Sequence, residues 1–140
     1  MSIIKFNYQV KFALRNRTYI KQCLHQLFVL EKRAYSRIDV IFCTDDYLLQ
    51  INKQSLQHNY YTDIITFNYA QPSTPIIGEL YISVHRVADN ASMYNVSQSQ
   101  ELHRVMLHGC LHLCGFTDVS TYQAKRIRAK EDAYLKLFNL

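Results

Sequence analysis

No hydrophobic run in this sequence is longer than four residues, although hydrophobic residues occupy 49% of its 140 positions. The longest runs, such as Val40 to Cys43, fall far short of the roughly 20 apolar residues needed to span a bilayer. The sequence also lacks the apolar stretch of an N-terminal signal peptide. A chain of this size can bury roughly two thirds of its unfolded surface. We therefore expect a single domain over residues 1–140, in a soluble cytoplasmic protein without a membrane partner.

Chain-breaking residues are scarce, with only three glycines and two prolines, and 19% of the residues are charged. This balance excludes a disordered or collagen-like chain. The four cysteines could form pairs, but a chain with a full-sized core and no export signal has no need of disulfide bonds. We interpret all four as reduced thiols.

The hydrophobic pattern places most strands before most helices. We expect strands over residues 3–10, 37–43, 62–69 and 79–84, where apolar residues alternate with polar ones or β-branched residues cluster. Helical spacing occurs over 19–30, around 48–51, and from 86 to the end, interrupted by a cap at Ser97 or Ser99 and a stop at Gly115. This order predicts an α+β domain, with a small mixed sheet of about four strands packed against helices.

Positive charge is concentrated in the first half of the chain. Residues 1–70 carry nine basic and five acidic side chains, and residues 71–140 carry seven and six. Clustered cations favour a polyanionic partner because they displace counterions from phosphate backbones. A solvated helix face with a mild cationic bias is the alternative interpretation.

The residues that indicate chemistry lie in the C-terminal half, on a predicted helix. His108 and His112 are four positions apart, so their rings emerge on one helix face and can reach one metal ion. Cys110 and Cys114 fall on the other side of this helix and are interpreted as small core residues. Gly115 lets the chain turn back, so that Asp118 could supply a third ligand. Two nitrogens and one oxygen leave a fourth position for water, as in catalytic zinc sites.

Gly109 stands between the two histidines. Glycine inside a helix costs about 0.5 to 1 kcal/mol relative to alanine. We therefore expect close approach of another backbone or of a substrate at this position. In HExxH metalloproteases the general base occupies the position of Gly109, so peptidase chemistry of that kind lacks its base here.

Glu131 interrupts an apolar stripe of the last helix, formed by Ala124, Ile127, Tyr134, Leu135 and Phe138. Its carboxylate either turns out to solvent or accepts a hydrogen bond from a metal-binding imidazole, as supporting carboxylates commonly do.

The run from His108 to Asp118 resembles the HGxLHLxGYDH signature of the YbeY family of endoribonucleases. Residues 62–67 (TDIITF) resemble the family's TDVLSF strand, and residues 78–83 (GELYIS) resemble its GDIxIS strand. The C-terminal helix with Lys130 and Glu131 also fits. The resemblance covers roughly residues 39–135.

This resemblance implies an α+β domain that binds one Zn²⁺ and cleaves single-stranded RNA. It implies a role in maturation of small-subunit ribosomal RNA and in ribosome quality control, with ribosomal RNA and the small subunit as partners rather than DNA. His108 and His112 match two zinc ligands of the family. The third position is Asp118 where the family commonly has histidine, so the third ligand would be a carboxylate.

A second departure concerns the phosphate contact. The family has an arginine ahead of the TDVLSF strand that is thought to engage the scissile phosphate, and the matching residue here is Leu56. An alkyl group cannot make the bidentate contact of a guanidinium. His58, two positions further on, is the candidate substitute as a phosphate or proton-transfer partner, and an exposed loop residue without a catalytic role is the alternative interpretation. The alternative function is a ribosome-assembly RNA-binding factor whose metal is structural.

Overall fold

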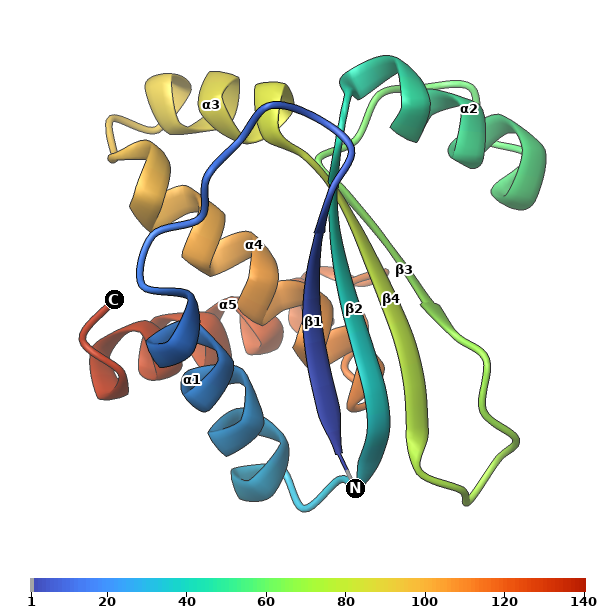
Figure 1. Ribbon diagram of the computed structural model, residues 1–140, viewed down its shortest axis with the longest axis vertical. Helices are drawn as coiled ribbons and strands as arrows, with labels where there is room; N and C mark the ends of the chain where they lie inside the picture. The colour runs from blue at the N-terminus through green and yellow to red at the C-terminus, as the bar shows by residue number, and fades with distance from the viewer. Residues whose placement is uncertain (1) are drawn as a thin grey trace.

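The computed structural model describes residues 2–140. These residues form a four-stranded sheet and five helices (Figure 1). The elements follow one another as β1 (Ile3–Tyr8), α1 (Arg17–Leu30), β2 (Tyr35–Cys43), α2 (Asp45–Leu56), β3 (Ile64–Asn68), β4 (Ile76–Ser83), α3 (Val84–Met93), α4 (Gln98–Leu113) and α5 (Thr121–Leu137).

The sheet is mixed and has the order β1-β2-β4-β3. Strands β1, β2 and β4 run parallel, while β3 pairs antiparallel with β4. The predicted α+β class with about four strands is confirmed. Strand β4 begins at Ile76, three residues before the expected start, because Ile76 pairs with Tyr35 of the neighbouring strand. Helix α3 likewise begins early, at Val84, because the Ser83 side chain caps it by accepting a hydrogen bond from the Arg86 N–H.

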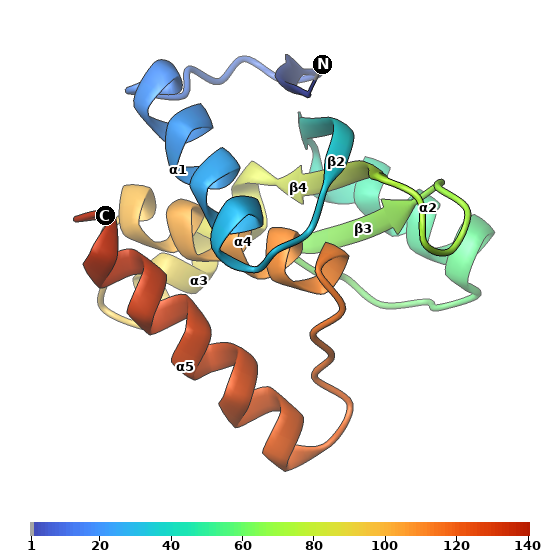
Figure 2. The ribbon, with the colours of Figure 1, turned by 90° about the horizontal axis from the view of Figure 1, so that it is seen from below.

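Helices cover the two faces of the sheet unequally. Helix α4 lies between the sheet and α5, with α1 beside it, and α2 lies toward the opposite face (Figures 1 and 2). The main core fills the space on the α1 and α4 side. A small cluster of Cys43, Leu48 and Ile65 packs under α2. The main core therefore fixes α4 and α5 in position against the sheet.

Gly109 allows α4 to pack directly against the sheet. A Cβ atom added at this position would lie 2.6 Å from Leu80 Cδ2 and 2.7 Å from Ile64 Cδ1. The close approach expected from the sequence is therefore made by side chains of β3 and β4, rather than by a backbone or a substrate. It sets the depth at which the neighbouring His108 sits relative to the sheet.

Gly109→Ala is expected to lower the free energy of unfolding by about 1–3 kcal/mol, because the added methyl group displaces packed core side chains. The higher helix propensity of alanine offsets only part of this loss. Urea denaturation measures the effect. Ser99→Ala, at an exposed position in the first turn of the same helix, serves as the control and should change stability little. Equal or higher stability of Gly109→Ala would contradict tight packing at this point.

All four cysteines are free in the structure, in agreement with the expected reduced thiols. Cys110 is fully buried in the main core, where burial raises the pKa of its thiol. Burial also raises the pKa of Cys114 to about 12. Neither thiol is therefore ionised near neutral pH.

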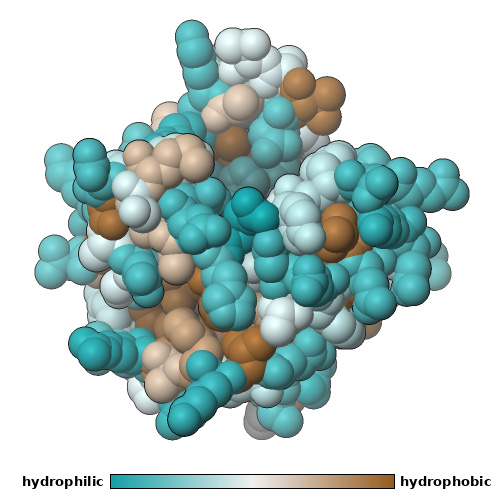
Figure 3. All heavy atoms as spheres, turned by 90° about the horizontal axis from the view of Figure 1, so that it is seen from above, coloured by the Kyte–Doolittle hydropathy of each residue, from teal (hydrophilic) through white to brown (hydrophobic). Residues whose placement is uncertain are grey.

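The face seen from above is mostly hydrophilic, with hydrophobic residues in scattered patches (Figure 3). Within residues 2–140, no helix combines the length and the hydropathy that crossing a membrane would require.

Candidate metal centre

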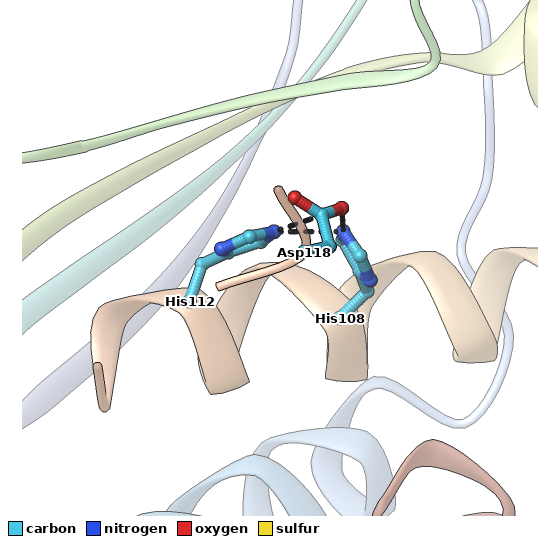
Figure 4. A group of neighbouring side chains, drawn as sticks. All are labelled: His108, His112 and Asp118. Carbon is cyan, nitrogen blue, oxygen red and sulfur yellow. Dashed lines mark hydrogen bonds and ion pairs between the residues drawn. The ribbon is translucent and has the colours of Figure 1, made fainter. Parts of the chain in front are cut away.

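Helix α4 presents His108 and His112 side by side on one face (Figure 4). The helix begins after Ser97, whose side chain accepts a hydrogen bond from the Gln100 N–H, and it continues to Leu113. Residues four positions apart are neighbours on a helix surface. The Nε2 atoms of the two histidines are accordingly only 2.9 Å apart.

The turn after α4 brings Asp118 to the two histidines. Gly115 has a φ of 107°, which favours glycine, and the Phe116 N–H donates to the carbonyl of Leu111. Asp118 Oδ2 lies 3.5 Å from His108 Nε2 and 3.6 Å from His112 Nε2. The three ligand atoms predicted from the sequence are thus close together.

These three atoms fit a tetrahedral zinc site. With metal–ligand bonds of about 2.0–2.1 Å, tetrahedral ligands are separated by about 3.3 Å. Both distances from Asp118 Oδ2 are slightly longer than this spacing, and the 2.9 Å between the two Nε2 atoms is shorter. Among residues 2–140, this is the one group of three or more His, Cys, Asp or Glu side chains whose ligand atoms lie within 4.8 Å of one another. Two imidazoles and one carboxylate also leave a coordination position open, as catalytic zinc sites do.

Glu131 of α5 binds the other ring nitrogen of His108. Its Oε2 lies 2.5 Å from His108 Nδ1, and its Oε1 accepts a hydrogen bond from Arg104 Nη1 at 2.9 Å. Arg104 also donates to Asp132 at 2.6 Å. Glu131 is only 3% exposed, so it adopts the buried, bonded alternative rather than the solvent-facing one. When a carboxylate accepts from Nδ1–H, the Nε2 lone pair remains free for a metal.

The pKa values of the two histidines are shifted in opposite directions. Burial favours the neutral ring at both positions. At His108, the hydrogen bond and the charge of Glu131 outweigh burial and raise the pKa. At His112, burial together with the charge of His108 lowers the pKa. His112 therefore keeps its neutral, metal-binding form to lower pH than His108 does.

A cavity of about 370 Å³ lies beside His108 and Asp118. Its wall combines charged, polar and apolar side chains from α3, α4, α5, the start of β3 and the adjoining turns, namely Asp63, Ile64, Asn90, Tyr94, Glu101, Arg104, Val105, His108, Asp118, Ala124, Ile127, Arg128 and Glu131. Burial is the main cause that raises the pKa values of Asp63 and Glu101 in this wall. The cavity is large enough to hold part of a substrate next to the predicted ligands.

His58 lies outside this cavity. It is exposed in the loop between α2 and β3, and its Nδ1 is 3.0 Å from the hydroxyl of Tyr60. Leu56 ends α2 and is 41% exposed. The structure therefore brings together His108, His112, Asp118 and Glu131, but does not add His58 to them.

Several residues of the cavity wall received no role from the sequence, among them Arg104, Glu101 and Asp63. Arg104 and Glu101 lie four and seven positions before His108, so helical periodicity places them on the same face of α4. That spacing is the signal that could have identified them. Asp63 lies just before β3, and it reaches the cavity only because the sheet packs against α4, so no local pattern indicates its position.

Comparison with known proteins identifies the family. The family model described as "Endoribonuclease YbeY" matches residues 4–139. The chain belongs to the YbeY family. The resemblance noted over residues 39–135 is thus confirmed, and it extends to the N-terminal residues, where no motif had been matched.

Individual relatives agree with this assignment. This YbeY chain is 43% identical over 136 residues to the protein named Endoribonuclease YbeY from Cytophaga hutchinsonii, covering 97% of this chain and 95% of the relative. It is 41% identical over 138 residues to the protein of that name from Flavobacterium psychrophilum, covering 99% and 98%. The solution structure of TM1509 from Thermotoga maritima has the same fold, with a TM-score of 0.67 at 24% identity, covering 97% of this chain and 89% of that one.

Proposed function

We propose that this YbeY chain is a zinc-dependent endoribonuclease that cleaves single-stranded RNA. It acts in maturation of small-subunit ribosomal RNA and in ribosome quality control, in the cytoplasm. The observation that carries this proposal is the convergence of His108 Nε2, His112 Nε2 and Asp118 Oδ2 beside a cavity. The relatives named endoribonucleases support RNA as the substrate.

The side chains around the centre have distinct tasks in this proposal. A zinc ion bound there would act as a Lewis acid on a phosphoryl oxygen of the RNA. His108 and His112 supply neutral nitrogens as ligands, and Asp118 supplies a carboxylate oxygen. Glu131 fixes the orientation of the His108 ring by accepting from Nδ1–H, and Arg104 holds Glu131 in turn. One ligand is thereby oriented before the ion arrives.

Arg128 is the cation of the cavity best suited to an RNA phosphate. It is exposed and makes no hydrogen bond or ion pair within residues 2–140, whereas Glu131 and Asp132 engage the guanidinium of Arg104. A free guanidinium can bind phosphate through two parallel hydrogen bonds. Tyr94 lines the same cavity, is 55% exposed, and offers a ring on which a base can stack.

The second candidate function is a ribosome-assembly RNA-binding factor with a structural metal. Leu56 favours it, because this residue replaces the phosphate-binding arginine of the family with an alkyl chain. Under the endoribonuclease proposal, His58 stays our prediction for a phosphate or proton-transfer partner near that position. In either function the basic first half of the chain would contact the RNA backbone.

Zinc-loaded protein is expected to cleave single-stranded fragments of ribosomal RNA. His108→Ala should lower the cleavage rate by at least about 100-fold, since loss of groups that merely support a ligand already costs about 10–100-fold. His85→Ala, which removes an exposed histidine of α3, is the matched control and should cleave like the wild type. Gel assays give the rate, and elemental analysis of the same samples gives the zinc content.

Stoichiometric zinc without any cleavage would reject the endoribonuclease. If His108→Ala then loses thermal stability along with its zinc, the structural role of the metal is favoured.

A further inference from the structure

Glu101 carries a buried carboxylate that has no partner in the described part of the chain. The residue is only 5% exposed and lines the cavity beside the metal centre, yet its side chain forms no hydrogen bond or ion pair with residues 2–140. The other carboxylates of the cavity wall all have partners, with Asp63 bonded to Asn90, Glu131 to His108 and Arg104, and Asp118 close to both histidines.

Within residues 2–140, His103 Nδ1 is the one buried side-chain polar atom without a hydrogen-bond partner, so the carboxylate oxygens of Glu101 are open to the cavity. A carboxylate in a nearly buried side chain has restricted access to water, and this one receives no hydrogen bond from the protein in exchange. The charge of Asp63 opposes its ionisation, and Arg104 and Arg128 favour it through charge alone, because neither guanidinium donates a hydrogen bond to it. An acceptor that faces a cavity and finds no donor in the protein matches a ligand that brings its own donor.

The position of Glu101 indicates which part of a substrate it would meet. Glu101 lies seven residues before His108, which is two turns along the same face of α4 and about 10.5 Å along the helix axis. If the metal centre holds the phosphate to be cleaved, neighbouring nucleotides of the strand extend along this face. Glu101 then faces a sugar or a base, while Arg128 stands at the same wall for a phosphate.

Among the donors of RNA, the ribose hydroxyl suits this acceptor best. Base N–H groups change with the sequence, whereas a 2′-hydroxyl is present at every ribonucleotide and is absent from DNA. Acidic side chains are established acceptors for ribose hydroxyls in dinucleotide sites. We propose that Glu101 accepts a hydrogen bond from a ribose 2′-hydroxyl in this cavity and thereby selects RNA over DNA. This inference rests on the proposed RNA substrate and names the residue that recognises its sugar.

Single-atom changes in the substrate test the contact. A cleavable single-stranded RNA oligomer is compared with versions in which one ribose at a time is 2′-deoxyribose. For the wild type, a 2′-deoxyribose at one position near the cleaved bond should lower kcat/KM by about 10–100-fold. This is the range for loss of a hydrogen bond to a charged group. Glu101→Met, which is similar in size and lacks the acceptor, should cleave both oligomers at the same low rate. Glu101→Gln retains an acceptor oxygen and should retain part of the difference.

Two outcomes would overturn the proposal. One is that no single deoxyribose changes the cleavage rate of the wild type. The other is that Glu101→Met has the same ratio of rates on the all-ribose and singly deoxy oligomers as the wild type. A purely structural role of Glu101 would alter the rates on both oligomers without altering their ratio. Thermal unfolding provides a further readout, since Glu101→Met removes an unpaired buried carboxylate and should be at least as stable as the wild type.

Binding separates this proposal from the proposed function. Fluorescence anisotropy with zinc-loaded protein compares an RNA oligomer with DNA of the same sequence, without requiring cleavage. If no oligomer is cleaved, the endoribonuclease proposal fails, and the ribose contact is decided by affinity alone. An RNA preference of about 10-fold that disappears in Glu101→Met supports the contact. Equal affinity of the wild type for RNA and DNA overturns it.

Discussion

Replacing Glu131 with alanine is expected to weaken zinc binding by about 10–100-fold, the usual effect of removing a group that orients a metal-binding histidine. It should also lower the free energy of unfolding by about 1.5–3 kcal/mol, because Arg104 loses the hydrogen bond to its buried partner and retains only Asp132. Glu131 is almost completely buried and bonds both His108 and Arg104. Zinc competition titrations and urea denaturation of metal-free protein measure the two effects separately.

Two further variants separate the contributions of Glu131. Glu131→Gln retains an oxygen that can accept from His108 Nδ1–H but loses the negative charge, so its zinc affinity should fall between those of the wild type and Glu131→Ala. Asp132→Ala removes the other, 59% exposed, partner of Arg104 and should cost only about 0–1 kcal/mol. Unchanged zinc affinity in a folded Glu131→Ala protein would show that this carboxylate does not support the centre.

Asp118→Ala is expected to lower zinc affinity by at least about 10–100-fold, because it removes one of three converging ligand atoms. Asp118→His should restore much of the affinity, since an imidazole is an equally suitable zinc ligand and the family signature has histidine at this position. Thr117→Ala, a change in the same exposed turn, is the control and should bind zinc like the wild type. Isothermal titration against a competing chelator gives the affinities.

If Asp118→Ala still binds one zinc ion tightly, Asp118 is not a ligand. A loss of zinc that Asp118→His fails to restore would instead indicate that a carboxylate, with its charge, is required here. Asp118 Oδ2 lies 3.5 and 3.6 Å from the Nε2 atoms of the two histidines, and these distances predict that Asp118 is the third ligand.

The parts of the site that were predictable from the sequence are those encoded by local spacing. His108 and His112 share a helix face because of a four-residue interval, and Gly115 permits the turn that returns Asp118. Glu131 was noticeable because a carboxylate interrupts an apolar stripe, although the sequence left its direction open. The structure resolves this by pairing it with His108 and Arg104.

The remaining features depend on contacts between distant segments. Asp63 reaches the cavity through the packing of β3 against α4, and Asn90 reaches it from α3. The sequence predicts a backbone or a substrate close to Gly109, whereas the side chains of Leu80 and Ile64 occupy that place. Such contacts connect residues separated by many positions, and hydrophobic periodicity carries no information about which of them meet.

The metal ligands and part of the cavity wall come from different segments of the chain. All three predicted ligands and the supporting carboxylate come from one helical hairpin, α4 to α5, whereas Asp63 and Asn90 enter the cavity wall from separate segments. Changes in those outer segments can therefore reshape what the cavity accepts while leaving the hairpin unaltered. The part of substrate preference that depends on Asp63 and Asn90 can therefore change by mutation independently of ion retention, whereas Glu101 and Arg128 share the hairpin with the ligands.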